Sequence, residues 1–304
     1  MDTVFSVVIL HFRQEKYLKN AIDSVTRQDC PSFEIIVADD HTPGFDRALA
    51  ETYFENCNVP HTIYSNEKNI GTVANLNKAL SMAKGRYIMF FAADDALKDE
   101  KVLTRFSEEL DAYQGKGFMV TAQAEMMDEN LEARLGYFVD DKTVSVSLDE
   151  TLSESEKAFL QHRENLYKSC FAIGASAFIK ERFLEYGGFP NDMRLIEDWS
   201  FLLDYTGKGM AVRYLPFTAL LHRAGGISEG GFSEKLQKIF ERDLLRIYYK
   251  RVLPHFSEAG SLGMKADIMR NYKGAEKDKL RKSVTFLKHP VTILYILISK
   301  FRKR

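Results

Sequence analysis

Four short strand-like segments alternate with stretches of helical spacing over the first hundred residues of the chain. The strand-like segments, each a mostly apolar run, cover residues 5–10, 33–38, 60–64 and 87–92. Such runs are typical of strands buried on both faces, as in a parallel sheet. The stretches that predict helices, where apolar residues recur every three or four positions, cover residues 15–27, 45–56 and 73–83. This alternation predicts an α/β fold with a mostly parallel sheet flanked by helices.

Two of the expected strands end in adjacent aspartates, Asp39-Asp40 and Asp94-Asp95. The carboxyl ends of parallel strands meet at the crevice where α/β folds bind ligands. Two carboxylates there do not both ionise cheaply unless water or a cation reaches them. Hard oxygen ligands suit Mg²⁺ or Mn²⁺. The repeated pair therefore indicates a nucleotide site, with one pair binding the base or ribose and the other a metal on phosphates. The alternative is that Asp94 and Asp95 cap a helix starting near residue 99.

Beyond residue 99 the pattern is less regular. We expect helices over residues 100–113, 156–167 and 196–205, a strand over 117–122, and two short strands within 211–221 separated at Pro216. Residues 140–155 are polar and predict a loop, and a glycine-rich loop is expected over 225–231. Small residues around Gly174 would let a ligand approach the backbone.

The C-terminal quarter is helical in pattern and basic. Residues 232–248 carry an apolar stripe that predicts a helix packing on the domain. From Lys265 onward the chain has twelve basic and three acidic residues, although the whole chain has a net charge of −1. Residues 286–304 hold an apolar run between basic ends, a pattern that favours contact with a membrane surface. Packing on the same domain or on a second subunit is the alternative. The overall charge gives no reason to expect a nucleic-acid partner.

Cys30, Cys57 and Cys170 show neither metal-ligand spacing nor an even count for pairing, which indicates reduced thiols. No signal-peptide pattern is visible, and no apolar run reaches the roughly 18–20 residues that a membrane span needs. We therefore expect a cytoplasmic protein, with a peripheral position on the inner face of the membrane through its tail.

Several of these segments resemble, in the expected order, the inverting glycosyltransferases of family 2, which have a GT-A fold. The resemblance covers most of residues 4–228. The matching segments are 6–13, Tyr17-Leu18, 33–42, Asn69-Ile-Gly71 with Asn77, Asp94-Asp95, 187–189, 197–199, and His222 followed by Gly226 and Ser228. The chain departs from the family pattern at Leu10, Arg13 and His41, where proline, asparagine and glycine are usual, and at Ala92, where an acid is usual.

The resemblance implies a role for each matching residue. Nucleotide binding is implied for Asp39, Asp40, Asn69, Gly71, Asn77 and Asp94. Mn²⁺ or Mg²⁺ binding is implied for Asp94, Asp95 and His222. Acceptor binding is implied for Gly174, Gly188, Glu197 and Trp199, with Asp198 as general base. The helix dipole would explain equally well why Glu197 and Asp198 stand in the first turn of the helix expected over residues 196–205.

The expected organisation is a GT-A domain over residues 1–230, with a nucleotide-sugar half (1–98) and an acceptor half (99–230). Residues 231–304 form a helical extension that associates with a membrane or oligomerises. The expected function is transfer of a sugar from a nucleotide-sugar, by family habit a UDP-sugar, to a hydroxyl of a glycan or lipid-linked acceptor in surface polysaccharide or glycoconjugate synthesis.

Two other functions remain open. A sugar-phosphate nucleotidyltransferase is disfavoured because the segment after the first strand has Arg13 and Lys16 but no glycine. A non-catalytic partner of another transferase would explain Ala92.

Overall fold

The computed structural model describes residues 3–55, 57–113, 115–225 and 233–301. Its strands are β1 (Phe5–His11), β2 (Phe33–Asp39), β3 (His61–Ser65), β4 (Tyr87–Ala92), β5 (Ala96–Leu97), β6 (Met119–Met127), β7 (Arg134–Tyr137), β8 (Ser176–Ile179) and β9 (Arg213–Arg223). Its α-helices are α1 (Glu15–Thr26), α2 (Arg47–Thr52), α3 (Thr72–Met82), α4 (Val102–Ala112), α5 (Asp141–Leu148), α6 (Glu154–Asn165), α7 (Lys180–Tyr186), α8 (Glu197–Gly207), α9 (Glu234–Ile247), α10 (Leu262–Ala275), α11 (Lys279–Leu287) and α12 (Pro290–Phe301). Short turns of 3-10 helix (η1, Ile173–Ala175; η4, Phe256–Glu258) and of π-helix (η3, Tyr248–Val252) connect some of them.

The strands form one mixed sheet in the order β3-β2-β1-β4-β8-β6-β9-β5, with β7 paired to β6. β1 pairs in parallel with β2 and with β4, and β2 pairs in parallel with β3. Beyond β4 the sheet is no longer all parallel, because β8 runs antiparallel to both β4 and β6. The predicted α/β fold, with a parallel part of the sheet and flanking helices, is confirmed.

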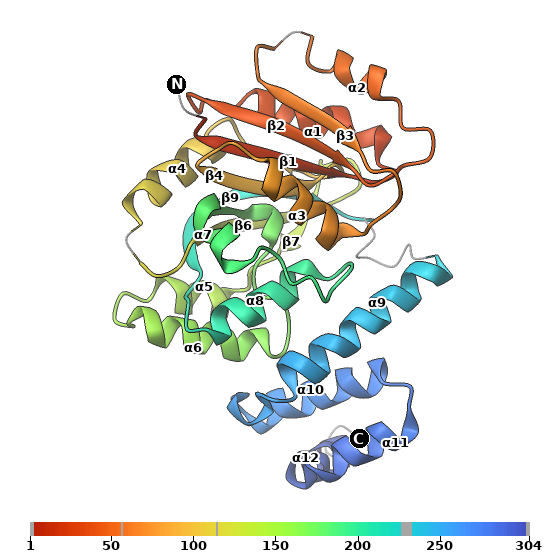
Figure 1. Ribbon diagram of the computed structural model, residues 1–304. Helices are drawn as coiled ribbons and strands as arrows, with labels where there is room; N and C mark the ends of the chain where they lie inside the picture. The colour runs from red at the N-terminus through yellow and green to blue at the C-terminus, as the bar shows by residue number, and fades with distance from the viewer. Residues whose placement is uncertain (1–2, 56, 114, 226–232, 302–304) are drawn as a thin grey trace.

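The two faces of β1 bury different residues, as the two-residue period of a strand requires. Phe5, Val7 and Ile9 belong to a core shared with α1 and α4. Val8 belongs to a second core shared with α3, α7 and α8. Figure 1 shows α3 in front of the sheet and the α5, α6 and α8 group below it. Burial on both faces explains why the sequence of the strand is apolar without interruption.

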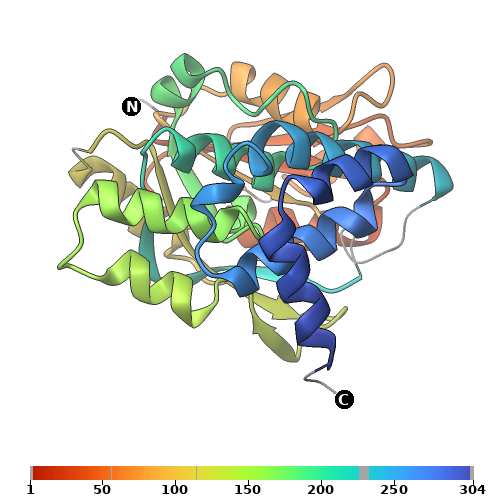
Figure 2. The ribbon, with the colours of Figure 1, turned by 90° about the horizontal axis from the view of Figure 1, so that it is seen from below.

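The C-terminal extension packs on the helices below the sheet (Figures 1 and 2). Ile247 and Tyr248 lie in the same buried cluster as Phe201 of α8, and so do Ile268 and Tyr272 of α10. The predicted helix over 232–248 is confirmed as α9, although Phe232 lies outside the described residues. The expected domain boundary at residue 230 also falls in the stretch that is not described. Among the described residues, no helix combines the length and the apolar character needed to cross a membrane.

Two predictions of local structure were wrong. Residues 140–155 were expected to form a loop, but they contain α5, whose first turn is capped by Asp140 accepting a 2.7 Å hydrogen bond from the Thr143 N–H. Its buried face includes the small polar residues Thr143 and Ser147, so the sequence lacks the regular apolar spacing that would predict a helix. Residues 211–221 were expected to be two strands, but β9 is continuous. Pro216 lies where the register with β6 shifts, so its missing N–H costs no ladder bond.

Candidate active site

The carboxyl ends of β2, β1 and β4 meet at one edge of the sheet. In the registers of β1, His11 lies opposite Asp39 of β2, and Leu10 lies opposite Ala92 of β4. With strands about 4.8 Å apart, the ends of β2 and β4 are separated by roughly 10 Å. The strand order runs in one direction from β1 to β3 and in the other from β1 to β4, which makes this edge a topological switch point, where open α/β sheets bind ligands.

Asp39 is fully buried at this edge and held by hydrogen bonds. Its Oδ1 lies 2.9 Å from His11 Nδ1, and the Thr42 N–H donates to both carboxylate oxygens at 3.3 and 3.1 Å. The Ser65 hydroxyl also donates to it. Burial alone would raise the pKa of Asp39, but the hydrogen bonds from His11, Ser65 and Thr42 outweigh it and lower that pKa. The sequence prediction missed His11, although its register position opposite Asp39 is a usable signal.

Asp40, Asn69 and Gly71, for which nucleotide binding is expected, come together in the structure. The Asp40 carboxylate accepts hydrogen bonds of 2.8 Å from the N–H groups of Ile70 and Gly71, and the Asn69 side chain donates to the Asp40 carbonyl at 3.2 Å. Gly71 has φ +92°, and a Cβ on it would lie 2.5 Å from Arg194 Cγ. Asp40 therefore holds the loop before α3, and Gly71 lets that loop approach Arg194.

Arg13 and His41, which stand where asparagine and glycine are usual in the family, both have a left-handed backbone conformation at this edge. Arg13 has φ 57° and His41 has φ 64°. The asparagine and glycine that are usual at these positions tolerate such angles better than arginine and histidine do. Hydrogen bonds hold both residues: the Arg13 N–H donates to Thr42 Oγ1 at 2.9 Å, and His41 Nδ1 lies 3.0 Å from the Asn66 carbonyl. These hydrogen bonds stabilise the loops after β1 and β2 with a left-handed residue in each.

Asp95 and His222 meet because β5 pairs antiparallel with β9. Ala96 lies opposite Leu221, so one further step of the same register places Asp95 opposite His222. His222 Nδ1 lies 3.0 Å from Asp95 Oδ2, and the Arg223 N–H donates to Asp95 Oδ1 at 3.0 Å. The Arg223 side chain also donates to the Asp94 carbonyl at 2.7 Å. The structure thus brings together Asp95 and His222, two of the three residues for which metal binding is expected.

The charge of this aspartate pair is not fully compensated by the protein. Asp94 is 8% exposed and Asp95 is 4% exposed. Burial, followed by the charge of Asp95, raises the pKa of Asp94 to about 6. A divalent cation would relieve this repulsion. Carboxylate oxygens beside an imidazole fit Mn²⁺ or Mg²⁺, so the residues present suit the metal that the sequence predicted.

Glu197, Asp198 and Trp199 form a third group at the start of α8. Asp198 Oδ1 accepts a 2.6 Å hydrogen bond from the Trp199 N–H, and the Ser169 hydroxyl also bonds to Asp198. Burial raises the pKa of both carboxyl groups, and the charge of Asp198 raises that of Glu197 further. The Trp199 indole N–H donates to the Asn165 carbonyl at 2.5 Å. A carboxylate with a raised pKa at a helix start can act as a general base.

The backbone just before α8 is held by the C-terminal extension. The N–H groups of Arg194 and Leu195 each donate to Asp243 Oδ2 of α9 at 2.7 Å. Arg194 Nη2 also donates to Asn69 Oδ1 at 2.9 Å, which connects the loop before α3 to the loop before α8. The sequence prediction missed Arg194 and Asp243. The signal for Asp243 is a charge on the apolar stripe of α9, where it is fully buried.

Asn77, Gly188 and Gly174 make packing contacts with residues other than the aspartates. Asn77 Oδ1 accepts a 2.8 Å hydrogen bond from the Phe189 N–H, and a Cβ on Gly188 would lie 2.5 Å from that oxygen. A Cβ on Gly174 would lie 2.9 Å from Leu220 Cδ2. Their binding roles stay predictions. Gly226 and Ser228, expected in the closing loop, lie outside the described residues.

Fold and site define a glycosyltransferase of the GT-A class, and comparison with known proteins agrees. Residues 6–187, more than half of the chain, match the model of the family described as Glycosyl transferase family 2. The chain belongs to this family.

Curated relatives share part of the chain. TuaG of Bacillus subtilis, a glycosyltransferase whose name refers to teichuronic acid biosynthesis, is 31% identical over 39% of this chain and 48% of its own length. An uncharacterized glycosyltransferase of Haemophilus influenzae is 24% identical over 66% of this chain and 61% of its own length. The chain thus spans about half to three fifths of these two relatives.

Solved structures confirm the GT-A fold. Staphylococcus aureus TarS 1–349 in complex with UDP-GlcNAc has a TM-score of 0.56 at 16% identity, covering 90% of this chain and 81% of TarS. The mannosyltransferase PcManGT from Pyrobaculum calidifontis, in complex with GDP-Man and Mn²⁺, has a TM-score of 0.59 at 14% identity, covering 99% and 85%.

Proposed function

We propose that this protein is an inverting glycosyltransferase that uses a nucleotide-sugar, with a UDP-sugar as the donor. The observation that carries the proposal is the contact of Asp95 with His222 at the sheet edge that also holds the buried Asp39. In the proposed reaction, Asp198 removes the proton of an acceptor hydroxyl. The acceptor oxygen then forms a bond to the anomeric carbon as the bond to the nucleoside diphosphate breaks. No covalent enzyme intermediate is needed for inversion.

Each residue group has a place in this proposal. Asp39, Asp40, Asn69, Gly71 and Asn77 belong to the nucleotide half, and Gly174, Gly188, Glu197 and Trp199 to the acceptor half. Asp95 and His222 would be the direct donors to Mn²⁺ or Mg²⁺, because their side chains are in contact, with Asp94 adding charge one residue away. A bound divalent cation would stabilise the negative charge of the departing diphosphate.

The names of relatives and neighbours support the substrate classes. TarS is a poly(ribitol-phosphate) β-N-acetylglucosaminyltransferase, and another relative, GgaB of Bacillus subtilis, is a minor teichoic acid biosynthesis protein. TarS structures contain UDP-GlcNAc or UDP, which supports a UDP-sugar here. We propose that the acceptor is a cell-surface glycan or its lipid-linked precursor.

A lipid-linked acceptor would require the protein to reach a membrane surface, and α11 and α12 have the features for this. Their exposed apolar side chains are Leu280, Val284, Leu287, Val291, Leu294, Tyr295, Leu297 and Ile298. The sequence from residue 279 to the end has no acidic residue and many basic ones. We propose that this face contacts an anionic bilayer on its cytoplasmic side, since apolar and basic side chains together favour such a surface.

The nucleotide specificity can be tested by thermal shift with UDP, GDP, CDP and dTDP, each with and without Mn²⁺. A ligand that binds the folded state raises the Tm by mass action. We expect a Mn²⁺-dependent shift with UDP that is absent in Asp95→Asn. No shift with any nucleotide would reject the donor assignment. Release of pyrophosphate from a nucleoside triphosphate and a sugar phosphate would identify a nucleotidyltransferase instead.

A further inference from the structure

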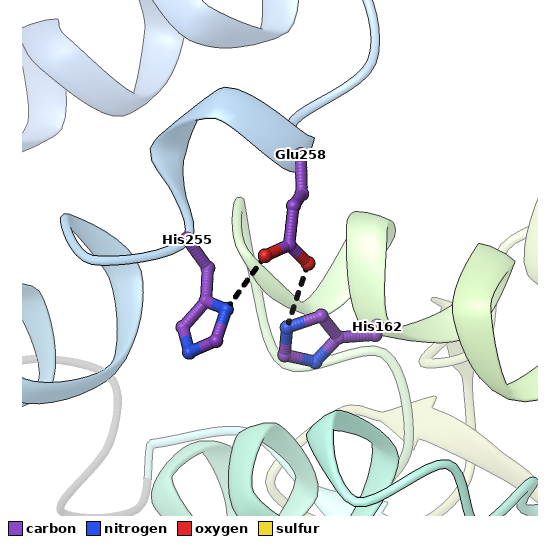
Figure 3. A group of neighbouring side chains, drawn as sticks. All are labelled: His162, His255 and Glu258. Atoms are coloured by element: carbon purple, nitrogen blue, oxygen red, sulfur yellow. Dashed lines mark hydrogen bonds and ion pairs between the residues drawn. The ribbon is translucent and has the colours of Figure 1, made fainter.

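Two histidines and a glutamate gather where the C-terminal extension meets α6, away from the sheet edge (Figure 3). His162 belongs to α6, His255 precedes η4, and Glu258 ends η4. His255 Nδ1 lies 2.8 Å from Glu258 Oε1, and His162 Nε2 lies 4.0 Å from Glu258 Oε2. One ligand atom from each residue lies within 4.8 Å of the other two.

The tautomer of His162 follows from its hydrogen bonds. The Thr206 hydroxyl donates to the Leu202 carbonyl at 2.6 Å, so its oxygen is an acceptor for His162 Nδ1, which lies 3.1 Å away. His162 therefore carries its proton on Nδ1, and the lone pair of Nε2 points toward Glu258. This nitrogen is buried and has no hydrogen-bond partner, on a side chain whose residue is only 4% exposed. A cation bound between this buried acceptor nitrogen and the carboxylate would give both groups a partner.

We propose that His162, His255 and Glu258 bind a Zn²⁺ ion that joins the C-terminal extension to α6. Imidazole nitrogen and carboxylate oxygen bind zinc at about 2.0–2.2 Å, which places ligand atoms of a tetrahedral ion roughly 3.3 Å apart. The distances here bracket that value, and rotation of the half-exposed His255 and Glu258 side chains would adjust them. Water would complete the coordination. Two imidazoles also favour zinc over the Mg²⁺ or Mn²⁺ proposed at Asp95.

The surroundings of the cluster support this role. The hydrogen bond from Nδ1 to Thr206 fixes the His162 ring, as is usual for a metal-binding histidine. A Cβ on Gly260 would lie 2.1 Å from Arg163 Nη2, so the segment after Glu258 already packs tightly against α6. The proposed ion would strengthen an existing contact between the two parts.

The test uses the full chain after chelator treatment, titrated with Zn²⁺ in the presence of excess Mg²⁺, which competes for carboxylate sites such as the one proposed at Asp95. The variants are His255→Ala and Glu258→Gln, whose side chains are 44% and 40% exposed, so both should fold. The matched control is His61→Ala, because His61 Nε2 forms a similar 2.9 Å contact with Glu51 and belongs to no such group of three among the described residues. Calorimetry should find one Zn²⁺ per wild-type chain, with affinity at least tenfold weaker in both variants and unchanged in the control.

A second readout separates a zinc site from a simple ion pair. Zn²⁺ should raise the Tm of the wild type and of His61→Ala but not of His255→Ala. Co²⁺ should give the intense visible absorption of a tetrahedral site in the wild type. Neither His255→Ala nor Glu258→Gln should show it. Equal Zn²⁺ affinity in the wild type and both variants would overturn the proposal, as would an equal loss of affinity in His61→Ala. These readouts do not depend on the proposed glycosyltransferase activity.

Discussion

His222 Nδ1 lies 3.0 Å from Asp95 Oδ2, although 127 positions separate the two residues in the chain. The two-residue strand β5 creates this contact, because its pairing with β9 brings the residue after Leu221 opposite the residue before Ala96. The imidazole and the carboxylate thus reach the same place from two separate parts of the sheet. This relationship is the basis for the proposed metal site.

Replacement of Asp95 by asparagine should reduce turnover by about two to three orders of magnitude, the scale seen when one preorganised charge-stabilising group is removed. The Mn²⁺-dependent Tm shift with nucleotide should disappear in the same variant. Asp23→Asn is the control, because Asp23 is an exposed aspartate paired with Lys19 on α1. Steady-state kinetics across Mn²⁺ concentrations provide the measurement. Full activity of Asp95→Asn would remove the metal assignment.

Asp198→Asn should reduce kcat by about 10²- to 10⁴-fold, the usual contribution of a positioned general base. Nucleotide binding should stay intact, because Asp198 lies at the start of α8 and not among the residues of the β2 and β4 ends. The comparison is between kcat and the nucleotide-induced Tm shift in the same preparation. If turnover is unchanged, another group is the base.

The pH dependence of turnover can identify Asp198 independently. Burial raises the pKa of its carboxyl group, and hydrogen bonds from the Trp199 N–H and then from the Ser169 side chain partly oppose that rise. A base must be ionised to accept a proton, so activity should be lost as the pH falls through this raised pKa. Ser169→Ala removes one of the opposing hydrogen bonds, so the acidic limb of the kcat/KM profile should move to higher pH. An unmoved limb would mean that the limb reports a different group.

The sequence predicted the buried parallel half of the fold because β1, β2 and β4 carry apolar side chains on both faces. It also predicted that the aspartates lie at one edge of the sheet, because they directly follow parallel strands whose carboxyl ends meet there. It missed α5, because that helix buries the small polar residues Thr143 and Ser147. It also failed to predict that β9 is one continuous strand. A proline inside a strand usually marks its end, and only the register shift between β9 and β6 shows why Pro216 is tolerated.

The contacts made by the site residues depend on tertiary pairing, which local pattern does not contain. The resemblance to the family placed His222 near the metal motif, but only the β5–β9 register explains its contact with Asp95. Asp243 belongs to α9 and stabilises the backbone of Arg194, 49 positions earlier. In the sequence, Asp243 stands out only as a charge on the apolar stripe of α9, and its contact with the backbone of Arg194 becomes visible only in the structure.

Asp243→Ala should destabilise the protein and disturb the start of α8. The change leaves the N–H groups of Arg194 and Leu195 without their acceptor, at a cost of about 1–3 kcal/mol for each buried group left unpaired. Chemical denaturation gives the loss of unfolding free energy, and kcat should fall at temperatures where the variant remains folded. Asp267→Ala is the control, because Asp267 is an exposed aspartate paired with Arg270 on α10. Equal stability of the two variants would contradict this role.

The exposed apolar face of α11 and α12 gives the last prediction. Leu287 and Leu294 are 80% and 57% exposed, while Ile293 and Ile296 of α12 pack toward the core. The wild type should co-sediment with vesicles containing phosphatidylglycerol, and less with pure phosphatidylcholine or at high salt, because salt screens the basic residues. Leu287→Glu combined with Leu294→Glu should weaken this binding by at least about tenfold, since two apolar contacts are replaced by charges that anionic lipid repels.

Leu135→Glu is the matched control, because Leu135 is 66% exposed on β7, a strand that Figure 1 shows apart from α11 and α12. It should bind vesicles like the wild type, because the contact depends on where the leucines lie and not on their exposure alone. Light scattering after size-exclusion chromatography distinguishes a second copy of the chain as the occupant of this face. A dimer that the double variant dissociates, together with no vesicle binding by the wild type, would assign the face to self-association and reject the membrane contact.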